Sequence, residues 1–432
     1  MQVEGSRRLR PRPIPTPMRG QSVLISGNGI AGPAVANWLL RYGCVPTMVE
    51  QAPAPRRSGH IIHLWGPGFD LVERMGLLPR VLAAGYRVRE VRLVDRQGRR
   101  TGGFKGERFE ALTNGRYISL PPGALSEILQ SSIDGRVESI FGDSISALEE
   151  DADGVLVHFR LSPSRRFDVV IAADGLHSTV RSLVFGPQSR FERFLGYTAA
   201  AFESTGYRPA DGADCVGFAV PGQQIMRYSM PDDRTSFLLL AAESRRVAAL
   251  PRDLDRQRAY LHRRFANTGW ESDRVLAALG DVDTLSFDRV SQIHMDAWSK
   301  GRVALVGDAA FAPSLMAGQG AALALVSAYV LAGEMARATS SSGSVQDAFS
   351  RYEQLLRKFM LQTQSAAARF ASSIAPRTGL GIFMRNQATR VLGSPLLARL
   401  AVGSSLVDDL ELPDYSTHAA HGGEPAASSC PV

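Results

Sequence analysis

A strand, a glycine-rich turn, a helix and a second strand near the N-terminus constrain the fold more than any other feature. Ser22–Ser26 and Pro46–Glu50 are short apolar runs typical of buried parallel strands, and Pro33–Tyr42 between them is predicted as a helix. The turn before this helix carries glycines at the GxGxxG spacing, namely Gly27, Gly29 and Gly32. Such a unit is typical of dinucleotide-binding α/β proteins, so the sequence predicts an α/β fold with a Rossmann-type domain.

The three glycines have separate tasks. Gly27 permits the tight turn, Gly29 lets the backbone approach a pyrophosphate, and Gly32 lets the helix pack closely on the strands. Ile30 and Ala31 supply backbone N–H groups at the helix start, where the helix dipole favours an anion. The turn is therefore predicted to bind the phosphates of a dinucleotide.

Glu50 ends the second strand, about 20 residues after the glycine turn. A carboxylate at this place accepts hydrogen bonds from an adenosine ribose, which favours an unphosphorylated dinucleotide such as FAD or NAD. Arg57 follows in a loop and is a candidate phosphate ligand, although a solvated loop arginine is the commoner outcome. His60 and His63 have no third ligand nearby, so they are interpreted as structural and no metal site is predicted.

A second strand-end turn pairs a glycine with an acid. The buried run Val169–Ala173 ends at Asp174 and Gly175. A helix starting at Ser178 then carries Arg181, and both the helix N-terminus and the guanidinium suit a phosphate.

A third such turn follows the strand Val303–Val306. Gly307 lets the backbone approach a ligand, and Asp308 offers a carboxylate to sugar-like hydroxyls. The apolar helix Ala321–Ala332 then opens with Gly318, Gln319 and Gly320. Bare N–H groups at a helix start favour the negative charge of a reduced flavin. Parallel strands present their carboxyl ends at one edge of a sheet, so the three turns are predicted to converge on one ligand.

The segments GNGIAG with Glu50, AADGLHSTVR and VGDAAFAPSLMAGQG resemble the three fingerprints of the class A FAD-dependent aromatic monooxygenases, the p-hydroxybenzoate hydroxylase-like family. The resemblance covers about residues 21–415. Its closing segment, Leu412–Tyr415, is similar to a segment found in bacterial family members of secondary metabolism. It implies an enzyme that binds FAD, takes electrons from NADH or NADPH, and uses oxygen to hydroxylate or epoxidise a bound substrate. The roles that it implies are the FAD pyrophosphate for Gly27, Gly29 and Gly32, the adenosine ribose for Glu50, FAD and the passing nicotinamide for Asp174 and Gly175, the ribityl chain for Asp308, and the flavin pyrimidine for Gly318–Gly320.

Three positions depart from the family pattern. Pro122 stands where relatives usually carry an arginine at a helix start, so one phosphate contact is expected to be missing. Phe311 and Leu315 stand where relatives often carry histidine and proline beside the flavin ring, which predicts a more apolar pocket wall. Neither of these two changes removes a charged partner, so FAD binding is still expected.

The predicted architecture interleaves the Rossmann-type FAD-binding domain with an antiparallel-sheet substrate domain and adds C-terminal helices. The predicted boundaries are a disordered tail over 1–20, the first part of the FAD-binding domain with inserted strands over 21–187, the substrate domain over 188–295, the rest of the FAD-binding domain over 296–337, a helical region over 338–415 and a disordered tail over 416–432.

The substrate domain is expected to roof the substrate with a sheet. Candidate roof residues are Met226, Tyr228, Met230, Phe237 and Leu239, although core filling is the commoner role for such side chains. No buried charged residue stands out, so the predicted substrate is a hydrophobic aromatic or polycyclic small molecule. No catalytic base is identified, since nothing ties His294 to the pocket.

Composition excludes several classes of partner. The net charge of +7 comes from scattered arginines, so nucleic acid is not indicated. The three cysteines, Cys44, Cys215 and Cys430, show neither pairing nor metal spacing, and no apolar run reaches the ~20 residues of a membrane span. A cytoplasmic protein is expected. Arginines among apolar residues around 381–391 and 395–400 leave peripheral membrane contact as an alternative to helices packed across the two domains.

Several activities fit the same scaffold. They include epoxidation, ring expansion, hydroxylation that triggers a rearrangement, and inactivation of an antibiotic. A FAD-binding protein that sequesters a reactive metabolite is an alternative from a different class. An NAD dehydrogenase is disfavoured, because the turns at Asp308 and Gly318–Gly320 would then have no ligand. The choice between NADH and NADPH and the oligomeric state stay open.

Overall fold

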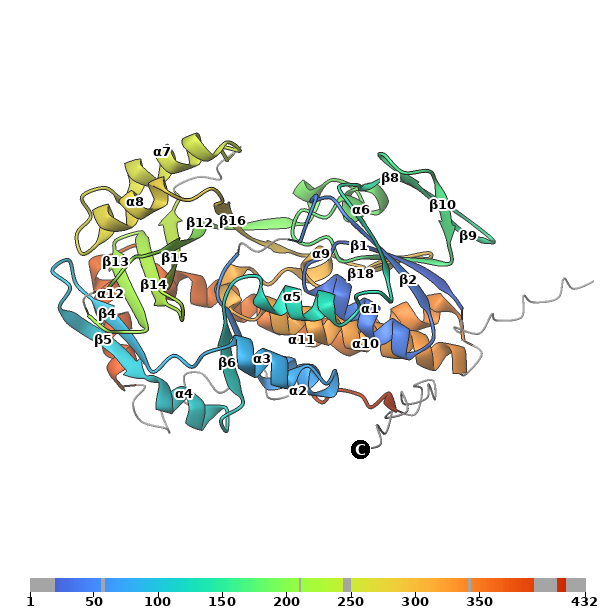
Figure 1. Ribbon diagram of the computed structural model, residues 1–432, viewed down its shortest axis with the longest axis horizontal. Coiled ribbons are helices and arrows are strands. Elements are labelled where there is room, and N and C mark those ends of the chain that lie inside the picture. The colour runs from blue at the N-terminus through green and yellow to red at the C-terminus, as the bar shows by residue number, and fades with distance from the viewer. Residues whose placement is uncertain are drawn as a thin grey trace, which may run out of the picture.

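The computed structural model describes residues 20–55, 59–209, 211–243, 250–340, 343–391 and 410–416. Outside these residues lie Arg57, the predicted helix around 395–400, and the predicted tails over 1–20 and 416–432 apart from Gly20 and Ser416. Figure 1 shows two parts side by side, a parallel sheet with long helices on the right and an antiparallel sheet with two helices above it on the left.

The first part is built on a six-stranded sheet in the order β17-β18-β11-β1-β2-β7. Its strands are β1 (Ser22–Ser26), β2 (Val45–Glu50), β7 (Glu138–Phe141), β11 (Val169–Ala172), β17 (Ser299–Lys300) and β18 (Val303–Leu305). All neighbouring strands are parallel except the pair β17 and β18. The three strands that end in the predicted glycine turns, β1, β11 and β18, are neighbours in this sheet, which brings their carboxyl ends together.

Long helices pack against this sheet (Figure 1). They are α1 (Ala31–Arg41), α10 (Gly320–Ser340) and α11 (Val345–Ile374), and the short helix α5 (Ala124–Ser131) packs on α1. In the part of the chain that the structure describes, α10 is the one helix long and apolar enough to cross a membrane. Nearly all of its apolar stretch is buried inside the protein. A helix that is apolar all round packs into a core, so α10 is a core helix.

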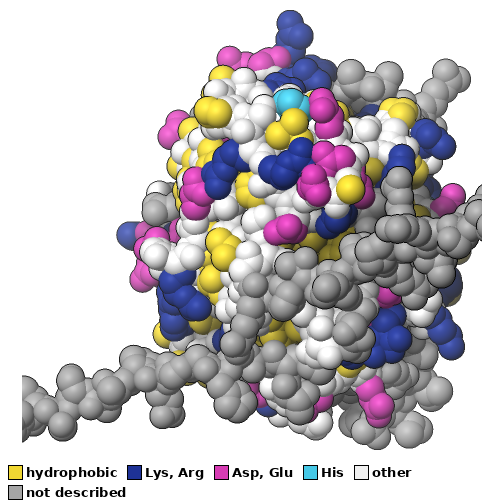
Figure 2. All heavy atoms as spheres, turned by 90° about the vertical axis from the view of Figure 1, so that its right-hand side faces the viewer, with side chains coloured by type: hydrophobic (Ala, Val, Ile, Leu, Met, Phe, Trp, Pro, Cys, Tyr) yellow, Lys and Arg dark blue, Asp and Glu magenta, His cyan; other side chains and the backbone are white. Residues whose placement is uncertain are grey.

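Shorter elements complete the first part. They are β3 (Ile62–Trp65) paired with β6 (Tyr117–Leu120), the three-stranded sheet β8 (Ile145–Asp151), β9 (Gly154–Phe159) and β10 (Arg165–Phe167), the helices α2 (Gly66–Arg74), α3 (Leu78–Ala84), α4 (Gly106–Leu112), α6 (Thr179–Val184) and α9 (Asp308–Phe311), and the 3-10 turns η1 (Gln188–Arg190) and η2 (Leu315–Ala317). On the face shown in Figure 2, basic and acidic side chains of the described residues are interspersed.

The second part is a seven-stranded sheet in the order β16-β12-β15-β14-β13-β4-β5. Its strands are β4 (Glu90–Val94), β5 (Arg100–Lys105), β12 (Glu192–Thr205), β13 (Cys215–Val220), β14 (Gln223–Ser229), β15 (Arg234–Ala242) and β16 (Ser286–Ile293). The strands β4 and β5 come from within the segment 21–187, and β4 pairs in parallel with β13. The predicted interleaved α/β architecture is confirmed, while the domain boundaries stay predictions.

Two helices cover one face of the seven-stranded sheet, α7 (Leu254–Phe265) and α8 (Ser272–Gly280). The sequence analysis missed both, because α7 is rich in arginine and shows a weak apolar stripe. Side chains alternate between the faces of a strand, and Phe237 and Leu239 pack beneath these two helices. Both therefore fill the core, which was the commoner role expected of the candidate roof residues, and neither roofs the substrate. Met226 and Tyr228 lie on the opposite face, toward the first part and the helix α12 (Gly379–Val391).

Candidate active site

The three glycine turns touch one another. Gly27 has φ +106°, and a Cβ atom added to it would lie 2.4 Å from the carbonyl oxygen of Ala173, so the first turn contacts the second. A Cβ added to Gly307 would lie 3.3 Å from the Cβ of Ala31, so the third turn contacts the start of α1. The convergence that the sequence predicted is thus present in the fold.

The glycines differ in what surrounds them. A Cβ added to Gly32 would lie 2.0 Å from the carbonyl oxygen of Gly27, so only glycine permits this helix–turn packing. A Cβ added to Gly29, Gly175 or Gly318 would meet no heavy atom within 4 Å. These three positions present bare backbone to open space, which suits a ligand that approaches the main chain closely.

Glu50 lies against the first turn. Its carboxylate accepts hydrogen bonds from the backbone N–H of Asn28 at 2.9 Å and of Ala52 at 2.8 Å. These contacts fix the Glu50 carboxylate at the end of β2. It lies against Asn28, which directly precedes the open Gly29. Ile30 precedes α1 and Ala31 is its first residue, so both lie at the positive end of that helix.

Asp174 keeps a carboxylate oxygen without a partner in the described part of the chain, whereas Arg181 bonds to backbone carbonyls. Asp174 accepts a hydrogen bond from the N–H of Val180 at 3.1 Å, and its other carboxylate oxygen is buried with no partner among the described residues. Burial raises the pKa of Asp174. Arg181 is fully buried and donates to the carbonyl oxygens of Ala309 at 2.9 Å and Leu176 at 2.7 Å. Its guanidinium therefore joins the second and third turns, a positional task that the sequence analysis did not foresee.

Asp308 faces the start of α10. A Cβ added to Gly320 would lie 4.0 Å from its carboxylate oxygen. The Asp308 side chain is accessible to water, yet the protein around it raises its pKa to about 6 through desolvation. Both properties hold together for a side chain that lines an enclosed hollow. Gln319 beside it is buried, and its side-chain oxygen has no partner among the described residues.

These features fit a dinucleotide with a flavin. Open glycine backbone and the N-terminus of α1 suit phosphates. The carboxylates of Glu50 and Asp308 accept hydrogen bonds from sugar hydroxyls, and the unpartnered oxygens of Asp174 and Gln319 accept further ones. Donors and acceptors of this kind, spread along one sheet edge, match a long ligand that carries hydroxyls and phosphates.

The departures from the family pattern lie mostly away from this hollow. Phe311 is buried, and its ring centroid lies 4.7 Å from that of Trp298. The prediction that Phe311 forms an apolar pocket wall is therefore wrong, because its ring fills the core. Leu315 packs against the small cluster around Met316 between the two parts. Pro122 is buried and approaches the position of Gly59.

The expectation that no buried charge stands out is also wrong. Arg227 on β14 is fully buried and forms ion pairs with Asp211 at 2.5 Å and Glu271 at 2.8 Å, on the α7–α8 side of the sheet. Arg385 on α12 reaches the other side and donates to the side-chain oxygen of Gln224 at 2.6 Å. Burial lowers the pKa of Arg385 to about 10. Sequence spacing gave no signal for either, because their partners are distant in the chain.

The raised pKa of Asp308 predicts a pH dependence of stability. The folded protein without cofactor holds this proton more tightly than the unfolded chain, whose aspartates have a pKa of about 3.9. Stability of the apoprotein should therefore fall as pH rises from about 4 to about 6. Asp308→Asn removes that loss, so the variant should melt at a higher temperature than the wild type at pH 7. The two proteins should melt alike below pH ~4. Thermal unfolding at several pH values checks this, and a constant difference at every pH would contradict it.

Comparisons with known proteins agree with this geometry. The chain matches the model of a family described as FAD binding domain over residues 21–363. It therefore belongs to this family, and within it to the class A flavin-dependent monooxygenases that the motifs predicted. The protein is thus a flavin-dependent monooxygenase that binds FAD.

Three relatives illustrate the similarity. A flavin-dependent monooxygenase from an unknown prokaryotic organism is 32% identical over 396 residues, which cover 91% of this chain and 99% of that protein. The crystal structure of tetracycline destructase Tet(55) is 29% identical with a TM-score of 0.77, covering 93% of this chain and 100% of that one. A single-substitution variant of Klebsiella pneumoniae HpxO, solved in complex with FAD, is 25% identical with a TM-score of 0.73 and covers 88% and 97% of the two chains.

Proposed function

We propose that the protein uses NADH or NADPH and oxygen to hydroxylate or epoxidise an aromatic or polyketide-type metabolite in secondary metabolism. The observation that supports this most is the meeting of the three glycine turns at one edge of the parallel sheet, in the part of the protein that lies beside the antiparallel sheet. Bound FAD supplies the electron transfer and the oxygen chemistry, and the protein supplies binding, orientation and shielding from water.

Each turn is assigned one section of FAD. Gly27, Gly29, Gly32 and the N–H groups of Ile30 and Ala31 hold the pyrophosphate, and Glu50 holds the adenosine ribose. Asp174 and Gly175 serve FAD and the passing nicotinamide, while Asp308 holds the ribityl chain. Gly318, Gln319 and Gly320 face the flavin pyrimidine, where the positive end of α10 stabilises negative charge on the reduced ring. Arg181 keeps the second and third turns in register through its buried hydrogen bonds.

A second candidate function is inactivation of an antibiotic. It is favoured by the similarity to the tetracycline destructases Tet(55) and Tet(51), each 29% identical with a TM-score of 0.77. Both functions place a polycyclic substrate between the flavin and the seven-stranded sheet. They differ in whether the substrate is an intermediate of the producer or a toxin that the enzyme destroys.

Location and partners follow as predictions. A cytoplasmic place, NADH or NADPH as reductant and a small aromatic substrate are proposed together. The comparisons give peripheral contact with a membrane no support. The thiols of Cys44 and Cys215 are free and buried, in keeping with a reducing compartment.

An anaerobic reduction experiment tests the proposal. The purified protein is mixed with NADH or NADPH, and flavin absorbance is followed with and without members of an aromatic panel that includes tetracycline. We expect one class of compound to accelerate reduction of the flavin by tenfold or more, about 1.4 kcal/mol in the barrier. Acceleration by tetracycline alone would favour the second function. A flavin that neither nicotinamide reduces under any condition would favour a sequestering protein instead.

A further inference from the structure

A buried triangle of polar side chains joins β3 to β6. The Nδ1 atom of His63 lies 2.9 Å from the hydroxyl of Ser119 and 3.1 Å from the hydroxyl of Tyr117. The two hydroxyls lie 2.6 Å apart. The sequence analysis interpreted His63 as structural, but a histidine held on one nitrogen by two hydroxyls has a fixed orientation and leaves its other nitrogen for a different partner.

The triangle lies next to the proposed flavin site. The strand β3 runs directly into α2, where a Cβ added to Gly68 would lie 2.6 Å from the Cβ of Ala322 in the first turn of α10. Leu64 is buried in the core of the first part, so its neighbour His63 points the other way. On that side the ring of Tyr228 from β14 lies 6.0 Å from the ring of His63.

These two neighbouring rings each carry a polar atom without a partner among the residues that the structure describes. In the described part of the chain, neither the Nε2 of His63 nor the hydroxyl of Tyr228 makes a hydrogen bond, and neither is among the fully buried polar atoms. Both atoms are therefore accessible, although the protein around both side chains lowers the pKa of His63 to about 4 and raises that of Tyr228. The two side chains are thus surrounded by protein, yet a small molecule can still reach their polar atoms. Such a position is typical of side chains that line a hollow.

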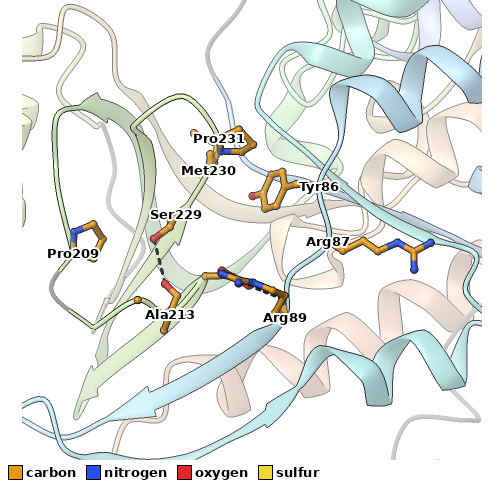
Figure 3. Close-up of a pocket in the computed structure, with 10 residues that line it drawn as sticks. Tyr86, Arg87, Arg89, Pro209, Ala213, Ser229, Met230 and Pro231 are labelled. Atoms are coloured by element: carbon orange, nitrogen blue, oxygen red, sulfur yellow. Dashed lines mark hydrogen bonds and ion pairs between the residues drawn. The ribbon is translucent and has the colours of Figure 1, made fainter.

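A pocket of about 390 Å³ opens beside this hollow (Figure 3). One of its walls is Tyr86, whose backbone bridges Ser119 of the triangle through two hydrogen bonds of 2.8 and 3.0 Å. Its opposite wall includes Ser229 and Met230, which directly follow Tyr228. The hydroxyl of Tyr86 points toward that strand in Figure 3 and is buried with no partner among the described residues. The pocket thus lies next to the triangle on one side and next to the end of β14 on the other.

One tautomer of His63 leaves a ring N–H donor outside the triangle. A neutral imidazole carries one donor and one acceptor nitrogen. If Tyr117 donates to Ser119 and Ser119 donates to Nδ1, both hydroxyl hydrogens are used within the triangle. The ring proton then resides on Nε2. Burial raises the pKa of Tyr117 to about 12, so its hydroxyl keeps its hydrogen.

We propose that His63 Nε2–H and the Tyr228 hydroxyl together bind an acceptor oxygen of the substrate, either a ring carbonyl or an enolate. This inference rests on the proposed function and narrows its substrate class. The substrate is an aromatic compound with a carbonyl or enolate oxygen near the ring, and a plain hydrocarbon of the same shape is discriminated against. Two donors left unpaired in a dry site disfavour a substrate that cannot accept from them. The predicted hydrophobic aromatic or polycyclic substrate is thereby narrowed to one that carries such an oxygen.

A matched pair of probes tests the proposal on the FAD-loaded protein. α-Tetralone and tetralin share a two-ring skeleton and differ in one carbonyl oxygen. Titration of each, followed by flavin absorbance, should give at least about tenfold tighter binding for the tetralone. His63→Leu and Tyr228→Phe should each reduce this preference severalfold, by weakening tetralone binding and by relieving the penalty that an unpaired donor imposes on tetralin. His63→Gln retains an N–H donor near the position of Nε2 and should restore most of the preference.

The outcomes separate this inference from the proposed function. Flavin content and reduction by nicotinamide are measured for every variant, and loss of FAD from the wild type would contradict the proposed function itself. A wild-type holoenzyme that is reduced normally, yet binds both probes equally or fails to bind the tetralone, would overturn the oxygen site alone. An unchanged preference in both His63→Leu and Tyr228→Phe would do the same. The wild-type comparison stands even if a variant fails to fold.

Discussion

Gly29→Ala is expected to lower the affinity for FAD by a hundredfold or more, about 3 kcal/mol, while the apoprotein stays as stable as the wild type. The added methyl group meets no protein atom within 4 Å, so folding has no reason to suffer. It stands instead where the FAD pyrophosphate is proposed to approach the backbone. Flavin content after purification and thermal unfolding of the apoprotein measure the two effects separately.

Gly32→Ala is the matched variant in the same turn. Its methyl group would lie 2.0 Å from the carbonyl oxygen of Gly27, which is main chain and cannot swing aside. The turn must open, at an expected cost of about 3 kcal/mol or more in the free energy of unfolding. Stability loss in Gly32→Ala with none in Gly29→Ala is the predicted contrast. A Gly29→Ala protein that retains FAD at wild-type affinity would show that the pyrophosphate lies elsewhere.

Arg181→Met is expected to destabilise the protein by about 3 kcal/mol and to weaken FAD binding. The guanidinium is fully buried, and its removal leaves the carbonyl oxygens of Ala309 and Leu176 without these donors. Because Ala309 follows Asp308, the third turn should loosen as well. Arg181 also lowers the pKa of Asp308, so the variant should bind FAD with a pH dependence shifted upward.

An exposed ion pair provides the control for Arg181. Arg165 pairs with Glu138 at 2.9 Å, and both side chains are more than a third exposed. Arg165→Met should therefore cost less than about 1 kcal/mol and leave FAD binding unchanged. Denaturant unfolding of the two variants and flavin titration check both points. Equal destabilisation by the two substitutions would contradict a special role for Arg181.

The cofactor side of this protein was predictable because its signals are local. Each glycine turn follows an apolar run within a few residues, and the parallel topology places the ends of β1, β11 and β18 at one edge. The motifs in the sequence and the adjacent positions of their strands in the sheet therefore point to the same ligand site. Gly32 and Gly29 could be assigned different tasks from their positions in the GxGxxG pattern alone.

The substrate side was less predictable because its contacts are distant in the chain. His63 meets Ser119 and Tyr117 across a strand pair, and Tyr228 comes from the other sheet. No spacing in the sequence signals such a group. The alternation of β15 was visible in the sequence. Which face of the sheet α7 and α8 cover was not, so the sequence could not separate Phe237 and Leu239, which fill the core, from the residues of the other face. Phe311 packs against Trp298 in the core, and no sequence signal pointed to this contact either.

Incorporation of labelled oxygen tests the central claim most directly. The FAD-loaded protein is supplied with NADH or NADPH, with isotopically labelled oxygen gas and with the compound that accelerates flavin reduction, and the product is analysed by mass spectrometry. A monooxygenase places one labelled oxygen atom in the product and the other in water. Substrate recovered without label while the nicotinamide is oxidised and all the oxygen is converted to hydrogen peroxide would contradict the assignment of this protein as a monooxygenase of that compound.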